Sequence, residues 1–426
     1  MLARPGFIGS GLKAEAWWTH AVFYQIAGVA PDFKAISARL DSLRSLGVDA
    51  LLLPAPALPA PGTNGSMPNL DDLDNLLRQA SGCGIRVLLT IQSPSASAGL
   101  SGVARFWLTR GVVGLHVATP AGTSAEDTQA IEQTLRKMAS SAAGQRIVIS
   151  DLDLAMPAVQ RPSKSPHTTT SHGRSADSST AQLQIDVRAD RLQILDAASL
   201  RPLLTQATPN LLLDLRAPAS ATGSTDARPP LADAVATIAL LGQATSLIDS
   251  GANLILTPAA EHSEALEQSE QPTKPTTPPP VAPPPGVYLP YVPYVPPSKS
   301  QPVAAPKPVA VPVDPLTAWY QKLAALHHDN PAFRGGSRTF LDFDAQNVLV
   351  WVNRPAMPSP HTPPIVVLCN LSSSPVHLSL TAEIKKLNLR GFFLRAVLRS
   401  DTGMGAQDVD AVTLPPFGAY IGELRM

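Results

Sequence analysis

The feature that most constrains the fold is a stretch of 44 residues, Pro272 to Pro315, that contains 17 of the 44 prolines in the chain. Proline has no backbone N–H to donate and fixes φ, so neither a helix nor a central strand can form there. We expect an extended polyproline II spacer. The sequence therefore predicts a large domain over residues 1–271, a proline-rich linker over 272–315 and a smaller domain over 316–426.

A second segment, residues 161–182, interrupts the first domain and has almost no apolar side chains. Burial there cannot offset the entropy lost on ordering, so we expect a disordered insert. His167 and His172 lie in this insert, but no carboxylate or cysteine stands at ligand spacing from them. We interpret both histidines as solvated rather than metal-binding.

Composition excludes several classes of function. The chain has 33 basic and 33 acidic side chains. It therefore lacks the net positive charge that is typical of proteins that bind nucleic acid or an anionic membrane. No uninterrupted apolar run of about 18 residues exists, and the start of the chain lacks the apolar core of a signal peptide. Cys83 and Cys369 are too few for a disulfide framework or a cysteine-rich zinc site, and they fit a reducing cytoplasm. We expect a cytoplasmic protein with no cofactor or metal and no nucleic-acid or membrane partner.

Eight short apolar runs alternate with helical patterns before the linker. Most are continuously apolar, which is typical of strands buried on both faces. Eight strands alternating with helices over about 250 residues predict a (β/α)8 barrel of the TIM type, with a doubly wound open sheet as the alternative. The strand candidates are Ala21–Ile26, Ala50–Leu53, Val87–Ile91, Gly114–Val117, Ile147–Ile149, Leu183–Val187, Asn210–Leu215 and Ala252–Leu256.

After the linker the pattern changes to one helix followed by strands. Apolar side chains from Leu316 to Leu326 recur at three-to-four spacing, and Asn330-Pro331 ends the helix. Several strands joined by turn residues then predict an all-β sandwich. The strand candidates are Val348–Val352, Ile365–Leu371, Val376–Leu380, Phe392–Leu398 and Ala419–Leu424.

Seven segments, in chain order, have the pattern of one known family. They are residues 17–26, 39–55, 70–90, 104–118, 319–336, 366–380 (VVLCNLSSSPVHLSL) and 414–424 (LPPFGAYIGEL). They resemble the α-amylase family, glycoside hydrolase family 13, and within it the bacterial α-glucosidase branch. The resemblance implies a (β/α)8 barrel with a C-terminal β domain, and a link to carbohydrate metabolism by descent.

The catalytic positions that the resemblance assigns are largely changed. Retaining glycoside hydrolysis needs a carboxylate nucleophile and a carboxylic acid about 5–5.5 Å apart. Where the family has its nucleophilic Asp, two residues after an Arg, this chain has Ala118 after His116. Thr90 replaces the Asp that ends the third strand, and Asp214 is interpreted as a loop carboxylate. Asp151 is the nearest match to the general-acid Glu that ends the fifth strand, and it is one methylene shorter. We therefore expect no complete catalytic set.

Three hypotheses follow for function. The one we favour is a catalytically silent homologue that serves as a scaffold or interaction protein, because Ala118 removes the covalent step. The second is an active glycoside hydrolase or transglycosidase that acts on α-glucosides with relocated residues. The third is a protein that binds an α-glucan or oligosaccharide without cleaving it. The sequence does not identify the protein partner that the first hypothesis requires.

Overall fold

The computed structural model describes most of the chain in segments. All of them belong to one compact unit that is formed by residues 1–259 and 314–426. Residues 260–313, with most of the predicted linker, lie outside the described residues, as does the predicted insert except Gln182. The described segments are 16–26, 31–58, 69–92, 99–118, 125–142, 144–151, 182–186, 197–206, 211–213, 215, 231–243, 245–249, 314–343, 347–357, 359–401, 403 and 405–426.

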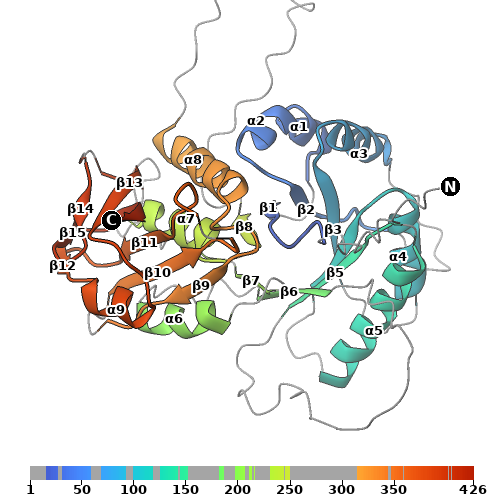
Figure 1. The fold of residues 1–426 in the computed structure, drawn as a ribbon. Helices are drawn as coiled ribbons and strands as arrows, with labels where there is room; N and C mark the ends of the chain where they lie inside the picture. The colour runs from blue at the N-terminus through green and yellow to red at the C-terminus, as the bar shows by residue number, and fades with distance from the viewer. Residues whose placement is uncertain are drawn as a thin grey trace, which may run out of the picture. The chain divides into compact units, whose positions relative to one another are not determined.

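The first part of this unit is an eight-stranded sheet with the order β7-β6-β5-β4-β3-β2-β1-β8 (Figure 1). Every neighbouring pair is parallel, and β1 pairs with both β2 and β8. No β7–β8 pair occurs among the described residues, so the predicted closed barrel is confirmed only in part. The strands are β1 (Val22–Gln25), β2 (Ala50–Pro54), β3 (Arg86–Gln92), β4 (Gly114–Ala118), β5 (Ile147–Asp151), β6 (Gln182–Asp186), β7 (Leu211–Leu213) and β8 (Ser246–Asp249).

Seven of these strands overlap the runs that the sequence predicted, but the eighth does not. The sequence indicated Ala252–Leu256, which lies outside the described residues. The structure places β8 at Ser246–Asp249, where all four residues are buried and paired with β1. The sequence did not indicate β8 because a four-residue run that begins with serine and ends with aspartate is a weaker apolar signal than ANLIL. Burial by neighbouring elements, rather than composition, makes it a strand.

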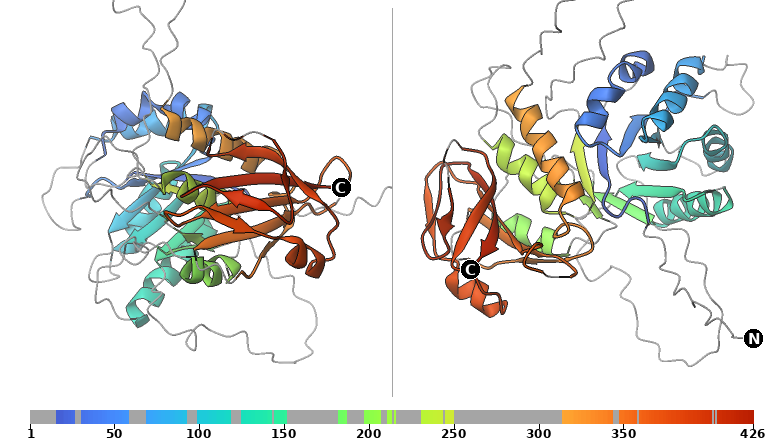
Figure 2. Two further views of the ribbon diagram at one scale, coloured as in Figure 1. Left: turned by 90° about the vertical axis from the view of Figure 1, so that its left-hand side faces the viewer. Right: turned by 45° about the horizontal axis from the view of Figure 1, so that its top comes forward.

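Helices cover the outer face of the sheet, as Figure 2 shows for α1 to α5. Alternate strand residues separate into two apolar clusters. Val22 and Leu51 pack toward the helices, whereas Phe23 and Leu52 pack with one another on the inner face. None of the described helices is long and apolar enough to cross a membrane. The helices of this part are α1 (Phe33–Ser37), α2 (Leu40–Ser45), α3 (Asp71–Gly82), α4 (Leu100–Thr109), α5 (Ala125–Ser141), α6 (Ala197–Gln206) and α7 (Ala232–Leu241).

The chain after residue 313 begins with the predicted helix, α8 (Pro315–Asp329). The Asp314 carboxylate accepts a hydrogen bond from Thr317 N at 2.9 Å and caps the helix, and Pro315 occupies its first turn. Proline is favoured there because that N–H has no partner within the helix. Leu316, Trp319, Tyr320 and Leu323 are buried as predicted.

The remaining strands form two antiparallel sheets that share an apolar cluster. The larger sheet has the order β14-β13-β16-β11-β10-β9, and β12 pairs with β15 in the smaller one. This confirms the antiparallel β part; β9, β14, β15 and the short helix α9 were not predicted. The elements are β9 (Ser337–Phe340), β10 (Val348–Arg354), β11 (Ile365–Asn370), β12 (Val376–Leu378), α9 (Thr381–Lys386), β13 (Phe393–Arg399), β14 (Gln407–Asp408), β15 (Val412–Leu414) and β16 (Ala419–Arg425).

Helix α7 lies between the parallel sheet and the antiparallel part and contacts both, including β8, β11 and β16. Every one of its residues except Asp233 is buried. Its last carbonyl groups accept hydrogen bonds from the antiparallel sheet. Trp351 Nε1 donates to Leu241 O at 3.2 Å, and the Arg338 guanidinium donates to Gly242 O and Gln243 O at 3.0 and 2.8 Å. These side chains satisfy helix-end carbonyls that the helix itself leaves without donors.

Candidate functional site at the carboxyl ends of the parallel strands

The inner face of the parallel sheet turns from apolar to polar toward the carboxyl ends of its strands. Phe23, Leu88 and Leu247 belong to the inner apolar cluster. Two residues further along the same strands, alternation places Gln25, Thr90 and Asp249 on that side. In parallel α/β barrels the active site lies at this end, so these positions form the candidate site.

Thr90 and His116 are paired at this end. They are register partners on β3 and β4, and Thr90 Oγ1 and His116 Nδ1 share a hydrogen bond of 3.1 Å. Gly114, two residues before His116, faces the side chains of Ile147 and Leu88, which fixes this side of β4 as the inner one. His116 is buried. A hydroxyl and an imidazole thus stand where the resemblance implies an Asp and an Arg, and this hydroxyl–imidazole pair supplies no carboxylate.

The predicted general-acid position, Asp151, ends β5 between two apolar positions. Val117 pairs with Ser150, so the same register places Ala118 beside Asp151 on the β4 side. On the β6 side Asp151 pairs with Ile185. Adjacent strands lie about 4.8 Å apart, which is close to the carboxyl separation of a retaining pair. Neither strand beside Asp151 offers a carboxylate at that level.

Sequence reasoning missed two polar residues of the site, Gln25 and Asp249. They are register partners that end β1 and β8. Asp249 is only 4% exposed, while Gln25 is half-buried and its Oε1 has no hydrogen-bond partner in the part of the chain that is described. Burial raises the pKa of the neighbouring Tyr24 to about 12, and the charge of Asp249 contributes to this shift. The available signal was the Asp that ends the SLID run, a run that is not among the strands predicted from the sequence.

The described site can therefore bind hydroxyl groups but lacks an adjacent pair of carboxylates. Asp249 supplies one buried carboxylate, and Gln25, Thr90 and His116 supply hydrogen-bond donors and acceptors. No cluster of three side chains able to hold a metal ion occurs among the described residues. Asp214, His167 and His172 lie outside the described residues, and so do the side chains of Ala118 and Asp151, of which only the backbone is described.

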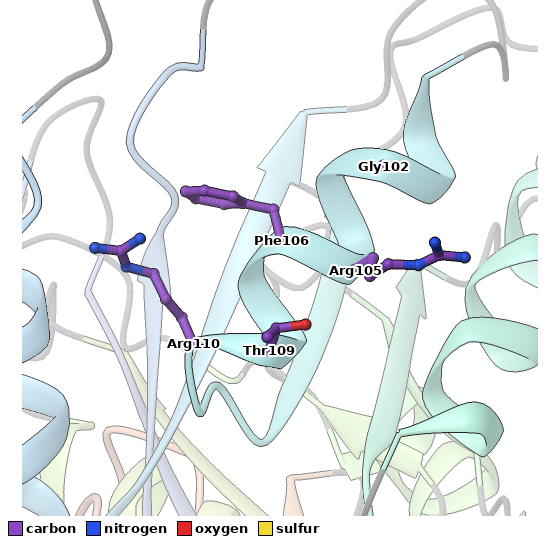
Figure 3. Close-up of a pocket in the computed structure, with 5 residues that line it drawn as sticks. All are labelled: Gly102, Arg105, Phe106, Thr109 and Arg110. Atoms are coloured by element: carbon purple, nitrogen blue, oxygen red, sulfur yellow. The ribbon is translucent and has the colours of Figure 1, made fainter.

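A hollow of about 430 Å³ lies elsewhere, along α4, and is lined by Gly102, Arg105, Phe106, Thr109 and Arg110. Figure 3 shows Phe106 and Arg110 pointing to one side of α4 and Arg105 to the other. The Arg110 guanidinium lies 5.3 Å from the centre of the Phe106 ring and donates to both carboxylate oxygens of Asp74. Trp107, next in the chain, is fully buried and belongs to the main apolar cluster, so it offers no surface to a sugar. The hollow is separate from the strand ends.

Comparisons with known proteins support the fold. No family model matches the sequence, and no match is found among curated proteins. Among the solved structures that resemble nearly the whole chain is isomaltulose synthase from Klebsiella sp. LX3 (TM-score 0.59, 14% identity, 97% of this chain and 100% of that chain covered). Two others are isomaltulose synthase from Erwinia rhapontici NX5 (0.58, 13%, 96% and 99%) and trehalulose synthase MutB from Pseudomonas mesoacidophila MX-45 (0.55, 13%, 96% and 100%).

The chain has an α-amylase-type fold. The sequence motifs implied this fold, and the structural likeness supports it over nearly the full length of the chain. At 13–14% identity the likeness concerns the fold alone. A fold of this type carries many functions, so the function of this chain depends on the residues at its own site.

Proposed function

We propose that this protein is a catalytically silent relative of the enzymes that act on α-glucosides, and that it serves as a scaffold or interaction protein. The proposal includes a closed (β/α)8 barrel followed by a β-sandwich. One observation carries it: the pairing of β5 with β4 and β6 puts Ala118 on one side of Asp151 and Ile185 on the other, so neither neighbouring strand has a carboxylate at that level. A glycosyl-ester intermediate needs a carboxylate nucleophile beside the acid.

The second supporting observation is the pairing of Thr90 with His116. Thr90 and His116 bond to each other, and this satisfies two buried polar side chains without a substrate. The cytoplasmic location expected from the sequence belongs to the same proposal, since Cys83 and Cys369 are both free thiols.

A second candidate function is catalysis through a relocated carboxylate, and Asp249 is the observation that favours it. This side chain is buried at the carboxyl end of β8, where barrel enzymes carry catalytic groups. Asp249 lies on β8 and Asp151 on β5, which are not adjacent strands, so the two carboxylates do not form a neighbouring pair in the sheet. A third candidate, sugar binding without cleavage, rests on the same polar strand ends.

The test is to incubate the full chain with an aryl α-glucoside, with maltooligosaccharides and with sucrose, of which isomaltulose and trehalulose are isomers. We expect no turnover. Turnover that Asp151→Ala or Asp249→Asn abolishes, while the exposed control Asp72→Asn retains it, would contradict the silent proposal. Titration calorimetry with the same sugars identifies the third candidate, which predicts binding without cleavage.

A further inference from the structure

No further inference is drawn: the strongest candidate, the hollow of about 580 Å³ at β13, β14 and β15 that is lined by Arg399, Asp401 and Asp408 among others, has Arg399 and Asp401 already paired with each other, and nothing in the described residues shows what would occupy it.

Discussion

Among single residues, His327 has an unusual environment. Its ring is fully buried in α8, Nε2 donates to His20 O at 3.2 Å, and Nδ1 has no hydrogen-bond partner among the described residues. Burial lowers the pKa of His327 to about 3, and the charge of the adjacent His328 adds to the effect. The folded state therefore holds this imidazole neutral, and it accepts no proton at mildly acidic pH.

This predicts a pH-dependent stability. Between pH 6.5 and 3 the unfolded chain takes up a proton at His327 that the folded chain excludes, so stability is lost as pH falls through this window. From pH 7.5 to pH 5 the loss should be about 2 kcal/mol, at 1.36 kcal/mol for each pH unit below 6.5. Urea denaturation of the native chain and of His327→Gln measures it, because Gln keeps a donor for His20 O but does not titrate.

The control for this prediction is His361→Gln, which changes an exposed histidine. It should keep the pH slope of the native chain, whereas His327→Gln should flatten it. Asp49 lies beside His328, with 3.4 Å between Oδ2 and Nε2. Burial raises the pKa of Asp49, so this carboxyl favours folding as pH falls further; measurements at pH 5 and above limit its contribution. An unchanged slope in His327→Gln would show that another group controls the acid response.

At the scale of elements, the contact between α8 and the turn that precedes β2 depends on Gly47. This glycine has φ +85°, and a Cβ there would lie 2.7 Å from Ala324 Cβ. His328 Nε2 donates to Gly47 O at 3.0 Å in the same contact. Helix α8 thus approaches this backbone closely, which only a residue without a Cβ permits.

Gly47→Ala should therefore destabilise the chain by about 3 kcal/mol, from left-handed strain together with overpacking. Gly84 is the matched control, because it has φ +77° but an added Cβ would meet nothing within 4 Å. Gly84→Ala should cost only the strain, about 1 kcal/mol. Thermal unfolding of the two variants separates these contributions. Equal losses would mean that α8 shifts away from the turn without cost.

Arg338 is the corresponding test for α7. Its guanidinium donates to Gly242 O, Gln243 O and Asn353 Oδ1, and burial lowers its pKa to about 10. Lysine keeps the charge but lacks the planar set of donors. Arg338→Lys should lower the free energy of unfolding by about 2 kcal/mol, measured by urea denaturation, because it leaves buried acceptors without donors. The exposed Arg334→Lys, in the turn before β9, should have no effect.

Elements with strong apolar periodicity were predictable from the sequence, and those specified by tertiary burial were not. Strand β10 and helix α8 carry their signal in consecutive side chains, so the prediction located them within two residues. Strand β8 has two apolar residues in four, and only its position between β1 and α7 makes it a strand. The same holds for the site. Motifs located Asp151 and Ala118, whereas the place of Asp249 and the contact between Thr90 and His116 follow only from the pairing of the strands.

At the scale of the whole molecule, the described parts before and after residues 260–313 belong to one compact unit. The three-part division predicted from the proline-rich stretch implies that the first domain, residues 1–271, can fold alone, and with it the part up to residue 259 that belongs to the compact unit. Helix α7 argues otherwise, since its Trp351 and Arg338 donors and much of its cover lie after residue 313. Removing residues 314–426 would expose an apolar helix with few polar side chains on any face.

We therefore expect residues 1–259, expressed alone, to aggregate or to bind a hydrophobic dye, with weak near-UV circular dichroism. Co-expression with residues 314–426 as a separate chain should restore a soluble complex, because the contacts with α7 do not require the connecting segment. Size-exclusion chromatography and the dye assay measure both outcomes. A soluble, dye-negative monomer of residues 1–259 with native near-UV dichroism would instead establish two independently folding domains, and α7 would then be stable without its cover.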